Sequence, residues 1–402
     1  MRARSLVVAA ASFFYSARGG PTPTRLPRLA VFLWSRGPTP ASLARAFALA
    51  RAAGAGSARC VATAFCSVSF LVFAMTVARA QSSALVKVTP LGSHAGELCR
   101  NDRALLFEDP TGVRILYDPG RTVDETDSRL GEVHVMLLSH AHNDHIGDVR
   151  PNYSAPGTCA APATGAANAN SNFASIASLK NAAVLAPGEL SGYLSRKIQN
   201  IRGSAPGACA EAGLDNTFDV PLGAPCTASL RPGGSRTARR AGASAMVRIA
   251  AVQAIHSNGV AAALVDSPGE APGLSGYGGS EAGFIITFSN GLVAYLTGDT
   301  GMFGDMETII SRYYKPTLVV PNMSDTVTLG PNETVYMMRN LVRPRTVMPS
   351  HVNEQATQGG AIRGGTRVDL FQLFARDLVD VVVPVSDVTR SFDGAGRCVG
   401  CR

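Results

Sequence analysis

The stretch Leu137–Asp148 reads LLSHAHNDHIGD and places three histidines and an aspartate within six residues, directly after an apolar, strand-like run. His140 and His142 are two apart, so an extended backbone can direct both imidazoles at one ion, while Asp144 and His145 can serve a second ion beside it. Zinc prefers this mixture of imidazole and carboxylate, and a catalytic site keeps one coordination position for water. HxHxDH is far more specific than a lone HxH, so the pattern favours a metal site over a polar loop with hydrogen-bonded histidines.

Charge is distributed unevenly along the 402 residues. The chain has 37 basic and 29 acidic residues, a formal charge of +8, but residues 1–80 hold ten arginines, no lysine and no acid. Without that segment 27 basic residues face 29 acidic ones, a net charge of −2. We therefore expect no nucleic-acid partner and no electrostatic attraction to an anionic membrane.

Residues 51–80 have the layout of a secretory signal peptide. Arginines flank a small-residue stretch, residues 60–77 are apolar, and Ala78-Arg79-Ala80 forms an AxA cleavage site. We expect cleavage after Ala80, a periplasmic or secreted protein, and no stable membrane association afterwards. The alternative is an uncleaved anchor, because 18 apolar residues approach the length that spans a bilayer. Residues 1–50 have no place in a standard signal and are interpreted as an over-extended start.

An even number of cysteines remains outside this leader. They are Cys99, Cys159, Cys209, Cys226, Cys398 and Cys401. Six cysteines outside the cytoplasm favour disulfides, but the sequence does not choose among the fifteen pairings. The terminal CVGC is alternatively half a zinc site or a redox pair, although no second CxxC is present.

The first half of the chain predicts strands separated by two excursions. The runs LVKVTPLG, ALLFED, GVRILYDPG and VHVMLLSH read as a meander that ends at the metal loop. Residues 151–180 and 203–243 have the small, polar composition of surface insertions, and a disulfide would hold the second one together. Between them, AAVLAPGEL predicts a strand and then a helix that continues to Ile198.

In the second half, strands alternate with helices. A strand leads to His256, a hairpin turning at 289–291 leads to Asp299, and a short strand leads to His351. Helices are predicted at 302–314, 332–342 and 368–378, and VVVPV is the last strand. We predict one α+β domain over residues 84–390, followed by a Cys-containing tail at 391–402.

Each candidate metal ligand lies at, or just after, the carboxyl end of a predicted strand. Five of the seven histidines lie there, and the remaining two, His94 and His134, are expected to be structural or to orient a ligand. Asp118, in a DPG after a strand, is a candidate near the site, with a simple turn residue as the alternative.

HAHNDH, the later IHS, TGDT and PSH resemble the metallo-β-lactamase superfamily and come in its order. The runs GFIITFSNGLVAYLTGDTGMFGDM and TLGPNETVYMMRNLVRPRTVMPSH are similar to bacterial metal-dependent hydrolases related to ascorbate-phosphate lactonase. Two departures stand out: the usual GHA is replaced by GSHA at 92–95, and Val352-Asn353 follows His351 where a tyrosine is usual. The resemblance implies an αββα four-layer sandwich.

The resemblance also implies a ligand set for two Zn²⁺ ions per chain, with Mn²⁺ or Fe²⁺ as alternatives. One zinc would be held by His140, His142 and His256, the other by Asp144, His145 and His351, and Asp299 would bridge them. Asp144 or Asp299 would also act catalytically, by carrying a proton to the leaving group.

We expect a hydrolase that attacks a small ester, lactone or phosphorylated molecule with a metal-bridging hydroxide. A phosphodiesterase or nuclease of the same superfamily is the main alternative, but it predicts a basic groove that the charge distribution does not offer. A β-lactamase is disfavoured, because the resemblance implies that true β-lactamases lack a bridging carboxylate. A metal-binding protein without chemistry is disfavoured because all seven ligand positions are filled. The substrate and the oligomeric state stay open.

Overall fold

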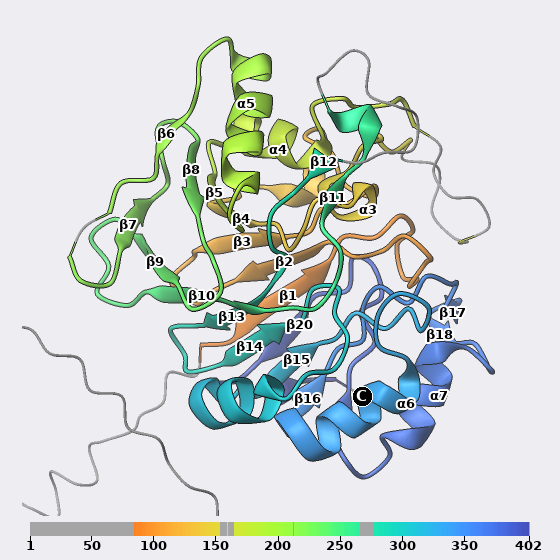
Figure 1. Cartoon of the computed structure of the whole chain (residues 1–402). Coiled ribbons are helices and arrows are strands. Elements are labelled where there is room, and N and C mark those ends of the chain that lie inside the picture. The colour runs from red at the N-terminus through yellow and green to blue at the C-terminus, as the bar shows by residue number, and fades with distance from the viewer. Residues whose placement is uncertain (1–83, 153–158, 160–164, 212, 266–275, 402) are drawn as a thin grey trace, which may run out of the picture. The chain divides into compact units, whose positions relative to one another are not determined.

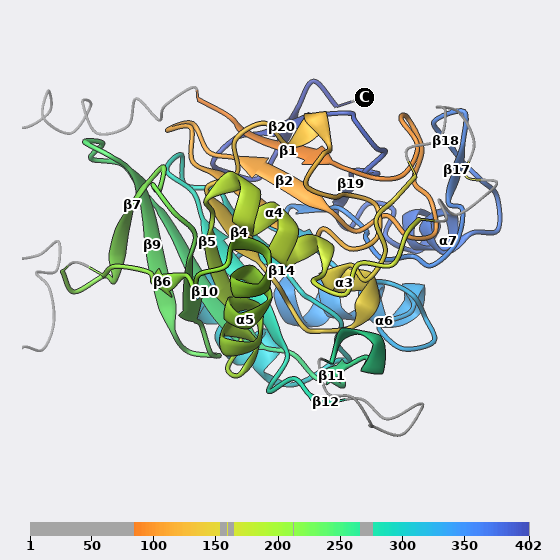
Figure 2. The same ribbon diagram turned by 90° about the horizontal axis from the view of Figure 1, so that it is seen from above.

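The computed structural model describes residues 84–152, 159, 165–211, 213–265 and 276–401. Within them, two large β-sheets pack face to face and helices cover the outer face of each (Figure 1, Figure 2). The four-layer αββα sandwich implied by the motifs is confirmed. Expectations about the signal peptide, its cleavage and the apolar 60–77 segment concern residues outside those described.

Among the described residues, the first sheet has nine strands and mixed pairing. In spatial order they are β21 (Cys398–Val399), β20 (Arg390–Phe392), β1 (Val86–Pro90), β2 (Leu105–Glu108), β3 (Arg114–Tyr117), β4 (Val135–Leu137), β5 (Ala183–Ala186), β8 (Cys226–Ser229) and β6 (Gly207–Ala208).

The second sheet has eight strands in the same described part of the chain. Their order is β19 (Asp380–Val381), β16 (Thr346–Val347), β15 (Leu318–Val320), β14 (Val293–Leu296), β13 (Ala282–Thr287), β10 (Val247–Gln253), β9 (Ser235–Arg240) and β7 (Thr217–Val220). Two small ribbons pair β11 (Gly259–Val260) with β12 (Gly276–Tyr277) and β17 (Thr357–Gln358) with β18 (Ala361–Ile362).

Helices cover both sheets on the outside. The first sheet is covered by α4 (Asn172–Lys180) and α5 (Leu190–Arg202), and the second by η3 (Met306–Tyr314), α6 (Pro331–Tyr336), η4 (Met337–Val342) and α7 (Arg367–Phe374). Short helices lie in loops: η1 (Ser128–Leu130), α3 (Asn143–Ile146) and η2 (Ala262–Leu264). In the described part of the chain, no helix is long and apolar enough to cross a bilayer.

Alternation along the strands explains the layers. In β2, Phe107 points between the sheets and stacks on Phe288, which follows β13 of the second sheet, whereas Leu106 points outward to the core under α4 and α5. In β14, Leu296 faces inward and Tyr295 faces the outer helices. Because both faces of each sheet are covered, such strands are apolar at consecutive positions rather than alternating with polar residues.

The meander prediction is wrong at its last step. Pairing is antiparallel from β1 to β2 and from β2 to β3, but β3 and β4 are parallel. A hairpin turn cannot join parallel strands, so the chain crosses over through residues 118–134, including η1, before it enters β4. The hairpin between β13 and β14 is as predicted.

The expected insertion at 151–180 ends in a core helix. In α4, Phe173, Ile176 and Ala177 are fully buried against the first sheet. Small residues such as Ala174 and Ser178 let the helix lie close to its neighbours, so a composition that is typical of a loop here serves close packing.

The expected insertion at 203–243 also belongs to the fold, because it supplies strands to both sheets. β6 and β8 extend the first sheet, and β7 and β9 extend the second. Their sequences, such as TFDV and CTAS, are short and only half apolar, so little besides pairing with neighbouring strands defines them. Residues 391–402, expected as a tail, likewise contribute β21 to the first sheet through pairing with β20.

All six cysteines outside the leader are paired: Cys99 with Cys159, Cys209 with Cys226, and Cys398 with Cys401. The second disulfide joins two parts of the 203–243 region, as predicted. The third pairs the two thiols of CVGC, so that motif is not half of a zinc site in this structure.

Candidate metal centre

The predicted ligands meet because their strands end at the same edge of the sandwich. In the second sheet β14, β15 and β16 are parallel, and β10 runs in the same direction, since both β10 and β14 pair antiparallel with β13. In the first sheet β3 and β4 are parallel. The ligand candidates follow these strands: His140, His142, Asp144 and His145 after β4, His256 after β10, Asp299 after β14 and His351 after β16.

All seven predicted residues lie together as two sets of metal-binding side chains. The first, called here the His140 group, contains His140, His142, His256 and Asp299, and the second, the Asp144 group, contains Asp144, His145 and His351. Within each group one ligand atom per residue lies within 4.8 Å of the others. This division matches the two ligand sets that the resemblance implied.

Asp299 contacts both groups. Its Oδ2 lies 3.5 Å from His256 Nε2 in the His140 group and 3.5 Å from His351 Nε2 in the Asp144 group. Its Oδ1 lies 3.4 Å from His145 Nε2 and accepts a hydrogen bond of 2.7 Å from the Asn322 side-chain amide. Asn322 follows β15, the strand between those that deliver Asp299 and His351, and it fixes the orientation of the shared carboxylate.

Asp118 is a ligand-orienting residue rather than a simple turn residue. It is fully buried after β3, and its Oδ2 accepts hydrogen bonds from His145 Nδ1 at 2.8 Å and from the Ser139 hydroxyl at 2.6 Å. That hydroxyl in turn contacts His140 Nδ1 at 3.0 Å. Because both Nδ1 atoms are engaged in this way, His140 and His145 are left with Nε2 for a metal.

The loop after β4 is shaped by close backbone packing. Asn143–Ile146 form a single helical turn, α3, which brings Asp144 and His145 round behind His140. The turn ends at Gly147, whose φ is +79° and where a Cβ atom would lie 2.2 Å from the Gly120 carbonyl oxygen. Only glycine fits here, so the GD of LLSHAHNDHIGD serves the geometry of the loop.

The buried nitrogen atoms of this cluster support the presence of a metal. His140 Nε2 and His145 Nε2 are buried and have no hydrogen-bond partner among the described residues. Buried polar atoms are almost always paired, and these two lie inside the clusters just described. The imidazole and carboxylate donors suit zinc, so the residues present fit the cofactor that the motif implies.

Charges within the cluster set the protonation states of the histidines. Burial and the neighbouring His145 lower the pKa of His140 well below its ordinary value. Burial acts the same way on His145, but the carboxylates of Asp299 and Asp144 outweigh it and raise the pKa of His145 to about 10. A metal bound at His145 Nε2 therefore displaces a proton, and binding releases that proton to solvent.

The carboxylates stay ionised although they are buried. Burial alone would raise the pKa of Asp144, but the guanidinium of Arg103 and His145 outweigh it and hold that pKa well below its usual range. For Asp299, His145 and His351 have the same effect. Both carboxylates are thus in the form that binds cations.

Several residues of the site were not predicted. Asn322 follows an apolar strand, LVVPN, so the rule that found the ligands could have found it too. Ser139 and Asn258, whose amide oxygen accepts from the Ala141 backbone N–H at 2.7 Å, give no comparable signal. Arg103, which contacts Asp144, gives none either.

The two remaining histidines lie outside both ligand groups. His94 Nδ1 contacts the Ser93 hydroxyl at 3.0 Å and Cys99 Sγ at 3.5 Å. His134 Nδ1 accepts from the Arg114 backbone N–H at 2.9 Å. Both contacts are of the structural kind that was expected of these two residues.

No family model matches the chain. A UPF0173 metal-dependent hydrolase of Cupriavidus necator is 31% identical over 269 residues, which cover 65% of this chain and 75% of that protein. A UPF0173 metal-dependent hydrolase of Cupriavidus taiwanensis is 28% identical over 278 residues, covering 67% and 79%.

Among solved structures, the chain is similar to Igni18, a metallo hydrolase from Ignicoccus hospitalis, with a TM-score of 0.47, 19% identity and coverage of 77% of this chain and 99% of that one. It is also similar to the metallo-β-lactamase fold protein YhfI from Bacillus subtilis, with a TM-score of 0.45, 12% identity and coverage of 76% and 99%. The resemblance to metal-dependent hydrolases drawn from the motifs is confirmed by the sequence relatives. Because the Cupriavidus necator protein is 31% identical over 75% of its own length, this chain belongs to the UPF0173 metal-dependent hydrolases.

Proposed function

We propose that this metal-dependent hydrolase uses two zinc ions to hydrolyse a small ester, lactone or phosphorylated molecule. The position of Asp299 carries the proposal, since one carboxylate contacts histidines of both ligand groups. A carboxylate has two oxygens and can hold two cations together, whereas a histidine nitrogen serves one. When bound, the zinc pair would lower the pKa of a shared water to roughly 7 and so supply a bridging hydroxide at neutral pH.

The two catalytic carboxylates have different surroundings. The Asp299 side chain is 3% exposed and is held by Asn322, which suits a bridging ligand. The Asp144 side chain is 25% exposed. Its Oδ2 contacts Arg103 and His351, whereas its Oδ1 forms no hydrogen bond with another described residue. We assign proton transfer between the attacking water and the leaving group to Asp144 Oδ1.

Export and a small-molecule substrate are part of the same proposal. Three disulfides support an oxidising compartment, the periplasm or the outside of the cell. The net charge of −2 outside the leader argues against an extended polyanionic substrate such as nucleic acid.

Zinc analysis of the full-length protein, combined with a hydrolysis screen, tests this function. The screen covers lactones, thioesters, phosphodiesters and β-lactams. We expect two zinc ions per chain and turnover of a small lactone, thioester or phosphodiester, but not of β-lactams. In Asp299→Ala, zinc should fall from two toward one per chain, because the Asp144 group loses the shared carboxylate. Turnover should collapse even when zinc is in excess.

Asp219 on β7 has an exposed carboxylate that pairs with Arg239 on β9, and it provides a matched control. Asp219→Ala should keep both zinc ions and normal turnover. A wild-type protein that binds one zinc, or an Asp299→Ala protein that keeps two tightly bound metals and near-normal turnover, would exclude the two-metal proposal.

A further inference from the structure

Arg103 is a buried arginine beside the metal centre. It lies two residues before the start of β2, and its side chain is 4% exposed. Its Nη2 donates to Asp144 Oδ2 at 2.6 Å and to Asn353 Oδ1 at 2.8 Å. One guanidinium nitrogen therefore joins a predicted metal ligand to the segment that follows another ligand, His351.

This contact links the two chain segments that build the Asp144 group. Asp144 lies in the HxHxDH loop, and Asn353 is two residues after His351. His351 Nε2 approaches the same oxygen as Arg103, Asp144 Oδ2, at 3.2 Å. Among the described residues, Arg103 is the hydrogen-bond partner of the Asp144 side chain that is not itself a candidate metal ligand.

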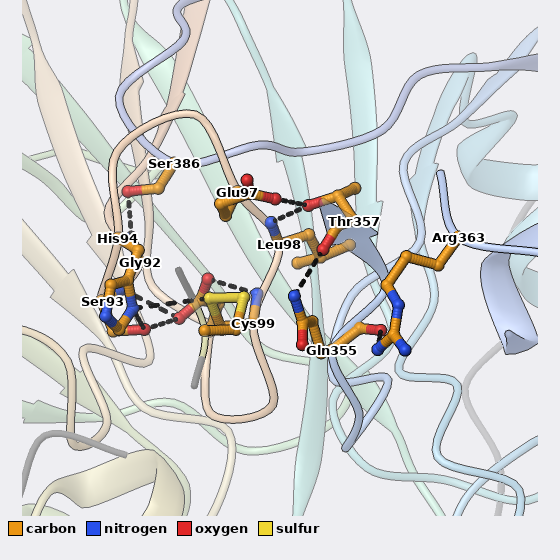
Figure 3. Close-up of a disulfide and its surroundings, with 12 residues drawn as sticks. Gly92, Ser93, His94, Glu97, Leu98, Cys99, Gln355, Thr357, Arg363 and Ser386 are labelled. Atoms are coloured by element: carbon orange, nitrogen blue, oxygen red, sulfur yellow. Dashed lines mark hydrogen bonds between the residues drawn. A yellow bond between two sulfur atoms is a disulfide. The ribbon is translucent and has the colours of Figure 1, made fainter. Parts of the chain in front are cut away.

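The loop before Arg103 is held firmly (Figure 3). The buried Asp102 carboxylate accepts from the backbone N–H groups of Ser93 and Cys99 at 2.9 and 2.8 Å. Cys99 is also linked to Cys159 by a disulfide. A Cβ atom at Gly92 would lie 2.3 Å from Asp102 Oδ2, so the loop closes tightly on this carboxylate.

The far side of the same loop is fixed to the segment that carries Asn353. Glu97 accepts a hydrogen bond from the Thr357 hydroxyl at 2.5 Å, and the Leu98 N–H donates to Thr357 Oγ1 at 2.7 Å (Figure 3). Glu97 also accepts from the Gly359 backbone N–H at 2.5 Å. These hydrogen bonds therefore hold the loop that precedes Arg103 against the segment that follows Asn353.

The Arg103 guanidinium is only partly hydrogen-bonded in the described part of the chain. Nε and Nη1 of Arg103 are buried and have no hydrogen-bond partner among the described residues. Keeping unpaired N–H groups of a charged side chain away from water costs stability. The contacts of Nη2 with Asp144 and Asn353 are the interactions that offset this cost, and Asp144 belongs to the candidate metal centre.

We propose that Arg103 is a positioning residue that orients Asp144 for metal binding by the Asp144 group. A charge-assisted hydrogen bond fixes the carboxylate before the ion arrives, and Asn353 fixes the guanidinium. The inference rests on the proposed two-metal function. One of the two departures from the family pattern, Asn353, is a direct partner of Arg103, and the other, GSHA at 92–95, lies in the loop that precedes it.

Zinc titration of the metal-free, full-length protein tests this role independently of turnover. Wild type should bind zinc in two steps. In Arg103→Met, the affinity of the Asp144 group should fall about 10 to 100-fold, the range for losing a partner that orients a ligand, while the His140 group keeps its affinity. Arg103→Lys should recover part of the loss, because an ammonium can still donate to Asp144.

Asn353→Ala is the matched variant, since it leaves the arginine in place and removes only its support. It should weaken zinc binding by the Asp144 group less than Arg103→Met does. If Arg103→Met does not fold, Arg103→Lys and Asn353→Ala carry the test. Unchanged affinities, an equal fall at both groups, or a rise at the Asp144 group would overturn the inference. A wild-type protein with a single zinc step would instead overturn the proposed function.

Discussion

At the scale of single residues, one buried carboxylate controls two metal-binding histidines. Asp118 accepts from His145 directly and reaches His140 through the Ser139 hydroxyl. These two histidines belong to different ligand groups. Asp118 can therefore align the two groups with each other, although among the described residues it forms no hydrogen bond with Asp144 or Asp299.

Asp118→Asn tests this control with almost no change in shape. The amide keeps one oxygen, but its NH₂ group cannot accept from His145 Nδ1, so the histidine loses the partner that fixes its tautomer. We expect zinc affinity of the Asp144 group to fall about 10 to 100-fold. Calorimetric zinc titration measures the effect. Ser139→Ala removes the hydroxyl between Asp118 and His140 but leaves the hydrogen bond from His145 to Asp118, so it should mainly weaken the His140 group, and a reversed pattern would contradict the network.

At the scale of elements, the two sheets are joined by a histidine far from the metal. His134 lies just before β4 and is 3% exposed. Its Nε2 lies 2.8 Å from Nη1 of Arg240, the last residue of β9 in the second sheet. Burial and this guanidinium lower the pKa of His134 in the folded protein, so folding favours the neutral ring.

The lowered pKa of His134 predicts how the free energy of unfolding changes as the pH falls. In the unfolded chain His134 titrates near its ordinary pKa of about 6.5, and in the folded chain it titrates lower. Its favourable contribution is present above pH about 6.5 and is lost as the pH falls toward the folded pKa, because the unfolded state then binds a proton that the folded state excludes. His134→Gln should therefore lose less free energy of unfolding between pH 8 and pH 5.5 than wild type. Urea unfolding at both pH values measures the difference, and equal losses would show that His134 does not contribute.

At the scale of the whole molecule, bound metal would join the two sheets. The Asp144 group takes Asp144 and His145 from the loop after β4 of the first sheet and His351 from the end of β16 in the second. The His140 group crosses between the sheets in the same way. Metal that binds only the folded protein stabilises it by mass action.

Chelation should therefore lower thermal stability. For each site, free zinc at 100 times Kd contributes about 2.7 kcal/mol, so removing both ions should lower Tm by at least several degrees. Differential scanning calorimetry with and without a chelator measures this, and added Zn²⁺ should restore Tm. Mg²⁺ should not, because it prefers all-oxygen octahedral sites. An unchanged Tm after complete zinc removal would mean that the metal does not link the sheets.

The sequence by itself predicted the seven candidate ligands and the strands that deliver them, and it determined the layered fold class. HxHxDH is local, and apolar runs followed by His256, Asp299 or His351 mark strand ends without any reference to distant residues. Only the tertiary structure showed that residues 203–243 form sheet strands and that α4 is a core helix. Weak strands and helices of small residues have little local signal and are defined by the sheets that they contact. The contacts of Arg103 could not be predicted from local sequence either, because its partners are 41 and 250 positions away. They meet only once both sheets have packed.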